Sequence, residues 1–308
     1  MNRHLITLDD LTPVEVEALF ELAGSLKLQR RQGIPHPQLS GKTLAMVFEK
    51  PSLRTRVTFE AGMTQLGGHA IYLAPADIRL GERETVQDAA RNLERWVDGI
   101  VARTFSHQMV ERLARYSRIP VINGLTDSHH PVQILCDLFT LWEKRGSLTG
   151  LAVGFIGDGN NVCHSWLQGA AKMGLRFTLA CPPGYEPDPT VVAQAQEQGK
   201  ASGAVLRVTH DPGAAARGAD VLYTDVWASM GQEEERARRL RDFQGYQVDG
   251  ALVHLASPEV LVMHCLPAHR GEEIAGEVMD GPRSIVFDQA ENRLHMQKAI
   301  LVALMGGN

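Results

Sequence analysis

An apolar run gives way to a basic, hydroxyl-rich one at Phe48-Glu49-Lys50-Pro51-Ser52-Leu53-Arg54-Thr55-Arg56-Val57-Thr58-Phe59-Glu60. Residues 43–48 are apolar and predict a buried strand, whereas residues 59–66 predict a helix. We therefore expect the segment between them to carry the chain from a buried strand to the N-terminus of a helix.

This turn has the features of an anion site. Backbone N–H groups and the positive end of a helix dipole favour negative charge. Ser52 and Thr55 add hydroxyl donors, and Arg54 adds a planar guanidinium that matches phosphate oxygens. A serine N-cap with a solvated basic turn is the simpler interpretation. Because arginine is disfavoured at the positive end of a helix, we expect Arg54 and Arg56 to meet an anionic partner.

Composition restricts the class of protein. The 308 residues suffice for two domains, and 44% hydrophobic with 22% charged residues is typical of a soluble globular protein. The net charge of -5 argues against nucleic acid as the main partner, and no apolar run is long enough for a membrane span. Residues 1–5 do not resemble the apolar segment of a signal peptide, so we expect none, and the four cysteines are widely spaced. We expect a cytoplasmic protein with reduced thiols.

Strands and helices alternate along the whole chain. Predicted strands are 43–48, 69–74, 99–102, 119–122, 151–156, 176–181, 205–209, 220–226 and 260–263. Predicted helices are 13–31, 59–66, 85–97, 107–116, 131–145, 162–173, 189–199 and 291–305. The alternation predicts an α/β fold of two doubly wound parallel-sheet domains, 1–146 and 147–290, with helix 291–305 packing back on the first. Ligands of such sheets bind outside the carboxyl ends of the strands, which predicts an active site in the cleft between the domains.

Polar side chains follow the strands of the first half. Arg103 comes directly after strand 99–102 and adds a second cation at the same sheet edge. His130 and Gln133 lie on either side of Pro131, which suits the first position of a helix. Both side chains can donate to a carbonyl oxygen, although simple helix capping is the alternative.

The second half carries different chemistry. Gly157-Asp158-Gly159-Asn160-Asn161 follows a strand but lacks the third glycine of a dinucleotide site, so nicotinamide binding is not expected. Asp225 and Ser229 share a turn, and a carboxylate there calls for a cationic ligand group. Cys265 lies between His264 and His269, but Pro267 excludes a helical His pair, so we predict no metal site.

Five motifs in this order make the chain similar to the aspartate/ornithine carbamoyltransferase family, and within it to the ornithine branch. They are Phe48-Glu-Lys-Pro-Ser52-Leu-Arg54-Thr55-Arg56, His130-Pro-Val-Gln133, Asp225-Val-Trp-Ala-Ser229-Met230-Gly231, His264-Cys265-Leu266-Pro267 and Glu291-Asn292-Arg293. The first two belong to the wider family, whereas the third and fourth are typical of the ornithine branch.

The resemblance implies a reaction and a set of site residues. It implies transfer of the carbamoyl group of carbamoyl phosphate to the δ-amine of L-ornithine, giving citrulline and phosphate in arginine biosynthesis, without a cofactor. Carbamoyl phosphate would be bound mainly by the first domain, through Ser52, Leu53, Arg54, Thr55, Arg103, His130, Gln133 and Arg293, and also through Cys265 and Leu266 of the second. Ornithine would be bound by the second domain, through Asn161, Asp225, Ser229 and Met230. The catalytic groups would be Arg54, Arg103, His130, Asp225 and Cys265.

The resemblance also implies trimers, or assemblies of trimers, whose sites are completed at subunit boundaries. Arg79 stands where the family commonly has Gln or His, so this cation would either reach the phosphate or turn to solvent. Asp225 argues against aspartate as the acceptor. Putrescine and N-acetylornithine remain open as acceptors, and so does a non-catalytic anion-binding module.

Overall fold

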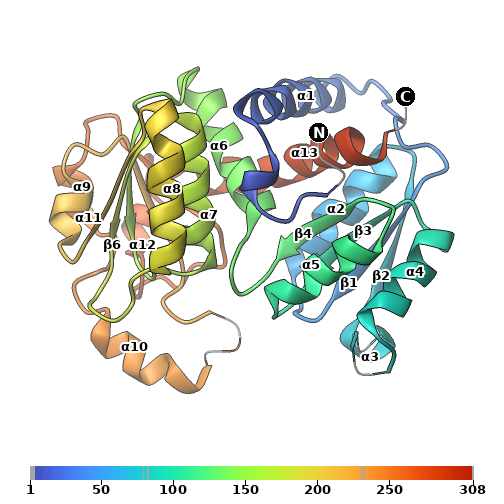
Figure 1. Cartoon of the computed structure of the whole chain (residues 1–308). Helices are drawn as coiled ribbons and strands as arrows, with labels where there is room; N and C mark the ends of the chain where they lie inside the picture. Colours follow the sequence, from blue (N-terminus) through green and yellow to red (C-terminus); the bar gives the residue numbers. More distant parts are fainter. Residues whose placement is uncertain (1–3, 79, 82, 230, 232, 307–308) are drawn as a thin grey trace. The chain divides into compact units, whose positions relative to one another are not determined.

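The computed structural model describes residues 4–78, 80–81, 83–229, 231 and 233–306. It divides into two compact units, residues 1–139 with 291–308 and residues 140–290. Both divisions fall within helices, α6 (Pro131–Arg145) and α13 (Val286–Met305), which Figure 1 labels. Within the described residues, no helix has the length and apolar character needed to cross a membrane.

The first unit contains a four-stranded parallel sheet in the order β2-β1-β3-β4. Its strands are β1 (Thr43–Phe48), β2 (His69–Leu73), β3 (Gly99–Arg103) and β4 (Val121–Leu125). Its other elements are η1 (Leu8–Asp10), α1 (Pro13–Arg31), α2 (Leu53–Gln65), α3 (Pro75–Ile78), α4 (Val86–Trp96) and α5 (His107–Tyr116).

Helices flank the sheet of the first unit. Leu93 of α4 and Val110 of α5 are buried in one cluster with Val47 of β1 and Ile100 of β3, so these two helices cover one face. Helix α2 packs closely against α13, because a Cβ atom at Gly62 would lie only 3.3 Å from Cγ of Lys298. Figure 1 shows this arrangement of helices around the sheet.

The second unit contains a five-stranded parallel sheet in the order β7-β6-β5-β8-β9. Its strands are β5 (Ala152–Ile156), β6 (Arg176–Ala180), β7 (Val205–Thr209), β8 (Val221–Thr224) and β9 (Leu261–His264). Its helices are α7 (Asn161–Met173), α8 (Pro189–Ser202), α9 (Pro212–Ala216), η2 (Glu233–Glu235), α10 (Arg236–Asp242), α11 (Gly250–Leu255) and α12 (Gly276–Met279).

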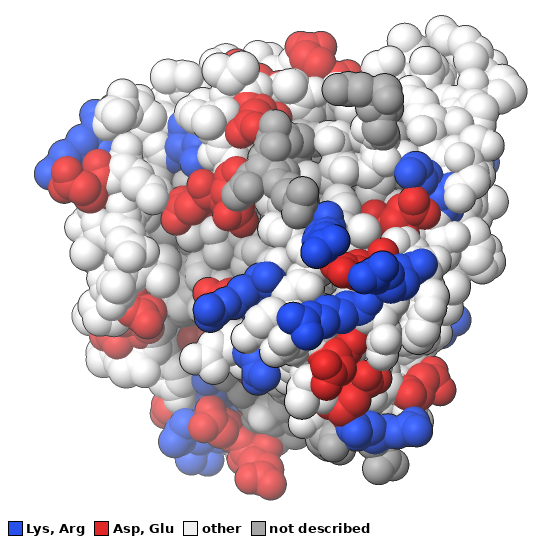
Figure 2. Space-filling model, turned by 45° about the vertical axis from the view of Figure 1, so that its right-hand side comes forward, with Lys and Arg blue, Asp and Glu red and all other residues white. Residues whose placement is uncertain are grey.

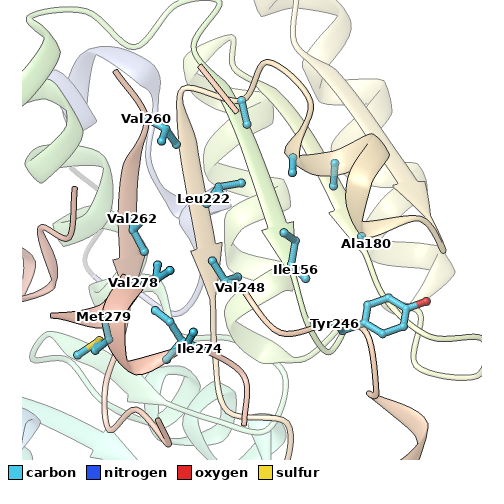
Figure 3. Packing of buried hydrophobic residues seen from close by; sticks show 14 of the residues in the cluster. Ile156, Ala180, Leu222, Tyr246, Val248, Val260, Val262, Ile274, Val278 and Met279 are labelled. Atoms are coloured by element: carbon cyan, nitrogen blue, oxygen red, sulfur yellow. The ribbon is translucent and has the colours of Figure 1, made fainter. Parts of the chain in front are cut away.

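Two apolar layers sandwich the second sheet. On one side, Trp166 of α7 stacks on Phe177 of β6 with ring centroids 6.1 Å apart and meets the edge of Tyr223 of β8. On the other side, residues of β5, β8 and β9 are buried with α9, α12 and the segment around Val248 and Ile274 (Figure 3). The sheet is thus buried on both faces, as expected of parallel strands.

The predicted fold class, two doubly wound parallel-sheet domains, is confirmed. Several predicted limits were wrong. Helix α2 begins at Leu53 rather than at residue 59, because Ser52 caps it. Strand β4 begins at Val121 rather than at residue 119, since Pro120 has no N–H to donate to the sheet. Helix α13 begins at Val286, five residues before the predicted start.

Charged side chains of both signs lie on the face that Figure 2 draws. Figure 2 shows Lys and Arg side chains beside Asp and Glu side chains across the face that it draws. This mixture agrees with the small net charge of -5. A nucleic-acid-binding face would instead carry a basic stripe.

Candidate active site

The predicted anion turn forms the N-terminus of α2. Ser52 has extended backbone angles and its side-chain oxygen accepts the N–H of Thr55 at 3.2 Å, which is N-cap geometry. A capped helix N-terminus of this kind favours an anion. Leu53 is 74% exposed, so its side chain points to solvent and its backbone N–H is the group suited to an anion.

The two arginines of this turn have different surroundings. Arg56 forms an ion pair with Glu60 at 2.9 Å, and its guanidinium lies 3.8 Å from the ring centroid of Tyr72. The anionic partner expected for Arg56 is therefore Glu60, an acidic side chain one helical turn away that balances its charge. Arg54 is half-buried beside the capped turn.

Arg103 is the last residue of β3 and is 5% exposed. It lies in register with Phe48 at the end of the neighbouring strand, so the strand ends bring Arg103 to the edge of the sheet where the anion turn begins. The chain reaches this arrangement because parallel strands place their carboxyl ends on one edge.

Arg293 of α13 connects three elements of the first unit. One guanidinium nitrogen donates to Oε1 of Gln133, and the other donates to Oγ1 of Thr55 at 2.9 Å. Gln133 in turn donates from Nε2 to Asp137 at 2.8 Å. All three side chains are at most 3% exposed, so the predicted residues Thr55, Gln133 and Arg293 form one buried network.

His130 directly precedes α6 and is 5% exposed. Burial lowers its pKa well below the usual 6.5, and the positive charges of Arg293, Arg103 and Arg54 lower it further. The imidazole is therefore neutral at pH 7. A neutral histidine beside three guanidiniums forms a site that favours a multiply charged anion and can donate to a carbonyl oxygen.

Asp225 is the centre of the predicted site in the second unit. It directly follows β8 and is 6% exposed. Its Oδ1 accepts a hydrogen bond from Sγ of Cys265 at 2.9 Å and one from the N–H of Val226 at 2.8 Å. The structure thus brings together Asp225 and Cys265, which are 40 residues apart in sequence.

Sequence reasoning missed two residues here. Asn160 caps α7 with its side-chain oxygen and donates from Nδ2 to Oδ2 of Asp225 at 2.8 Å. The predicted neighbour Asn161 is instead the first residue of α7. Asp158 pairs with Arg239 at 2.6 Å, and burial raises its pKa to about 6 despite that cation. The glycine-rich segment was the only signal that this loop approaches the site.

Possible metal ligands cluster at the end of β9. Ligand atoms of Asp225, His264 and Cys265 lie within 4.8 Å of one another, and so do those of His269, Glu272 and Glu273. However, Nδ1 of His264 accepts the N–H of Leu266 and its Nε2 contacts Glu273. Since both ring nitrogens of His264 are engaged, a metal at the first cluster would have to break one of these bonds.

The remaining predicted residues are placed as follows. Ser229 is half-buried in the loop after β8, and Leu266 follows Cys265 after β9. Met230 and Arg79 lie outside the described residues. The four cysteines all lie within the described residues and form no disulfide.

Comparison with known proteins agrees with this geometry. Residues 3–143 match the model of the aspartate/ornithine carbamoyltransferase carbamoyl-P binding domain, and residues 149–304 match that of the Asp/Orn binding domain. The chain belongs to the aspartate/ornithine carbamoyltransferase family. The resemblance inferred from the sequence motifs is thereby confirmed.

Similar proteins lie within the ornithine branch. One relative, named ornithine carbamoyltransferase, from Carboxydothermus hydrogenoformans, is 54% identical over 99% of this chain and 98% of its own length. A relative from Pyrococcus furiosus, named ornithine carbamoyltransferase, anabolic, is 51% identical over 99% of this chain and 97% of its own. A solved structure of the ornithine carbamoyltransferase from Pyrococcus furiosus covers 99% of this chain and 97% of that chain, with a TM-score of 0.97.

Proposed function

We propose that this chain is an ornithine carbamoyltransferase, which transfers the carbamoyl group of carbamoyl phosphate to the δ-amine of L-ornithine and releases citrulline and phosphate. The observation that carries the proposal is the arrangement of cations in the first unit, where Arg293 donates to Thr55 of the capped α2 turn and Arg103 ends β3, the strand beside β1. Such a group of charges suits a phosphate dianion beside a carbonyl. Named relatives of about 50% identity over nearly the full chain support the same reaction.

The first unit binds the carbamoyl donor in this proposal. The N-terminus of α2, with Ser52, Leu53, Arg54 and Thr55, holds the phosphate oxygens. Arg54, Arg103 and His130 polarise the carbamoyl carbonyl and stabilise the oxyanion that develops on it. Gln133 and Arg293 fix the geometry around Thr55. We also propose Cys265 and Leu266, from the turn after β9, as residues that bind carbamoyl phosphate.

The second unit binds the acceptor. Asp225, held by Asn160, orients the amine of ornithine together with Cys265, while Asn161, Ser229 and Met230 contact the amino-acid end. The neutral δ-amine attacks the carbamoyl carbon, the bond from that carbon to the phosphate oxygen breaks, and the departing phosphate accepts the proton of the amine. Holding the amine and the carbamoyl carbon in reacting geometry would supply much of the rate. This reaction requires neither cofactor nor metal.

Assembly and location complete the proposal. We propose a trimer or an assembly of trimers, with Arg79 near a subunit boundary, and light scattering after gel filtration tests the trimer. We also propose a cytoplasmic location, in arginine biosynthesis. The absence of disulfides among the four described cysteines is consistent with a reducing compartment.

The test is an assay of phosphate release from carbamoyl phosphate with four acceptors side by side, namely ornithine, putrescine, N-acetylornithine and aspartate, and citrulline is measured in addition for ornithine. We expect kcat/KM to be largest for ornithine. A larger value for putrescine or N-acetylornithine would assign a different acceptor. Binding of carbamoyl phosphate in calorimetry without turnover of any amine would favour a non-catalytic module.

A further inference from the structure

The turn that follows β9 has an unusual backbone. Leu266 has a φ of 60°, and among the described residues it is the one non-glycine residue with a positive φ. Side chains with a Cβ atom seldom adopt this conformation, which persists where the surroundings hold it. Cys265, whose thiol contacts Asp225, immediately precedes this residue.

His264 holds this turn through a defined tautomer. The N–H of Leu266 donates to Nδ1 of His264 at 2.8 Å. A backbone N–H can only donate, so Nδ1 carries no hydrogen, and the hydrogen of the neutral ring is on Nε2. Nε2 lies 3.1 Å from Oε1 of Glu273 and donates to it. His264 is 1% exposed and Glu273 is fully buried.

Glu273 is fixed by its own backbone and by the apolar core. Its carbonyl oxygen accepts the N–H of Val248 at 2.9 Å, and the next residue, Ile274, forms a bridge with Val248. Figure 3 shows Ile274 and Val248 among the side chains of the buried cluster. The carboxylate also accepts the N–H of His269.

The carboxylate of Glu273 remains ionised despite its burial. Burial pushes the pKa of Glu273 up, but the hydrogen bonds from His264 and from the backbone of His269 outweigh it and hold the pKa below the usual 4.5. A charged acceptor at this position favours the hydrogen on Nε2 of His264. That tautomer leaves Nδ1 able to accept the N–H of Leu266.

We propose that Glu273 is a positioning residue, which acts through the tautomer of His264 to hold the turn at Cys265 and Leu266 and so the contact of the Cys265 thiol with Asp225. The inference rests on the proposed function and deepens it, because it names a buried carboxylate that prepares the acceptor site without touching either substrate. Glu273 belongs to the core of the second unit, so the core itself determines the shape of the site.

The matched variants are His264→Asn and His264→Gln. The asparagine side chain places an oxygen near the position of Nδ1, where it can accept the N–H of Leu266, whereas glutamine reaches the position of Nε2. We expect His264→Asn to keep at least about ten times the kcat/KM for ornithine of His264→Gln, since small misplacements of reacting groups lower rates by up to about 100-fold. Equal activity of the two variants would overturn the proposal.

A double-mutant cycle separates positioning from simple core packing. Glu273→Ala in the parent chain should lower kcat/KM for ornithine by about 10- to 100-fold, whereas Glu273→Gln, which keeps an acceptor oxygen, should stay within about threefold. In the His264→Asn background, Glu273→Ala should cost less than about threefold, because asparagine needs no tautomer. The same loss in both backgrounds would show that Glu273 only packs the core.

A readout without turnover keeps this inference distinct from the proposed function. The rate at which iodoacetamide alkylates Cys265, followed by peptide mass spectrometry, should rise several-fold in Glu273→Ala and stay near the parent value in Glu273→Gln. Unchanged alkylation in Glu273→Ala would contradict the positioning role. If the parent chain formed no citrulline but the alkylation rates differed as expected, the proposed function would fail and the positioning role would stand. If Glu273→Ala does not fold, the comparison of His264→Asn with His264→Gln still tests the positioning role.

Discussion

Both units are parallel sheets flanked by helices, yet the side chains at the carboxyl ends of their strands have opposite charge. In the first unit, Arg54, Arg103 and Arg293 act together on a buried neutral histidine. In the second unit, Asp225 is buried with a thiol and an amide as its side-chain partners. One architecture thus provides an anion site and a cation site.

The difference shows how two domains of the same fold can each be suited to a different substrate of one reaction. The backbone of each unit supplies the same elements, strand ends and helix N-termini, and only the side chains placed there select the ligand. On these electrostatic grounds we propose that the first unit binds the phosphorylated donor and the second unit binds the amine. The following experiments test this assignment, beginning with the largest expected effect.

Removing the guanidinium of Arg54 should strongly weaken the binding of carbamoyl phosphate to the first unit. We expect Arg54→Ala to lower kcat/KM for carbamoyl phosphate by about 100- to 1000-fold, the range found when one donor to a developing charge is lost. Steady-state kinetics and calorimetry with carbamoyl phosphate measure the effect. If Arg54→Ala bound carbamoyl phosphate with unaltered affinity, the anion turn would not be part of the binding site.

Neutralising Asp225 should damage the second site and leave the first intact. Asp225→Asn keeps the size of the side chain but loses the charge that attracts an amine, so we expect kcat/KM for ornithine to fall by about 100-fold. The dissociation constant of carbamoyl phosphate, measured by calorimetry, serves as the internal control and should change little. A comparable loss for both ligands would mean that the sites are not divided by charge.

The acid stability of the protein should report the cluster around His130. Its pKa in the folded state lies well below 6.5, whereas the unfolded chain takes up this proton near pH 6.5. The contribution of His130 to the free energy of unfolding is therefore fully present above pH 6.5. It decreases as the pH falls below that value. Between pH 7.5 and 5, we expect the Tm of His130→Asn to fall by about 2 to 4 °C less than that of the parent. Parallel curves would show that neither burial nor the arginines lower the pKa of His130.

The smallest effect is expected at Arg56, which belongs to the same motif as Arg54. Because Arg56 is paired with Glu60 and stacked on Tyr72, Arg56→Ala should change kcat/KM for carbamoyl phosphate by less than about threefold. It should lower the stability by about 0.3 to 0.5 kcal/mol, as for exposed pairs on a helix. A loss as large as that of Arg54→Ala would place Arg56 among the phosphate ligands.

The anion turn could be predicted because its signal is local. Ser52, Arg54 and Thr55 are adjacent in sequence, and the alternation of strand and helix shows which ends of the strands they occupy. The partner of Arg56 was equally local, four residues away, but the helix was predicted to begin too late to place both residues on it. The early start of α13 was missed because Ile285, Val286 and Phe287 have side chains that favour strands.

The side chains that hold the residues of the second site in place, Asn160 and Glu273, could not be predicted from the sequence. Asn160 reaches Asp225 across 65 residues, and the contact exists only because β5 and β8 are neighbours in the sheet. Glu273 lies in a short polar segment without periodic pattern, and only the folded core reveals that it is buried beside His264. Local pattern therefore predicts the residues proposed to bind ligands, whereas the side chains that support them depend on tertiary packing.

The most direct test of the division between the units is a crystal structure with carbamoyl phosphate alone. The phosphate should lie at the N-terminus of α2, about 3 Å from donor atoms of Ser52, Arg54 and Thr55, with the carbamoyl oxygen toward Arg103 and His130. Carbamoyl phosphate bound instead beside Asp225, with the α2 turn unchanged, would contradict the account.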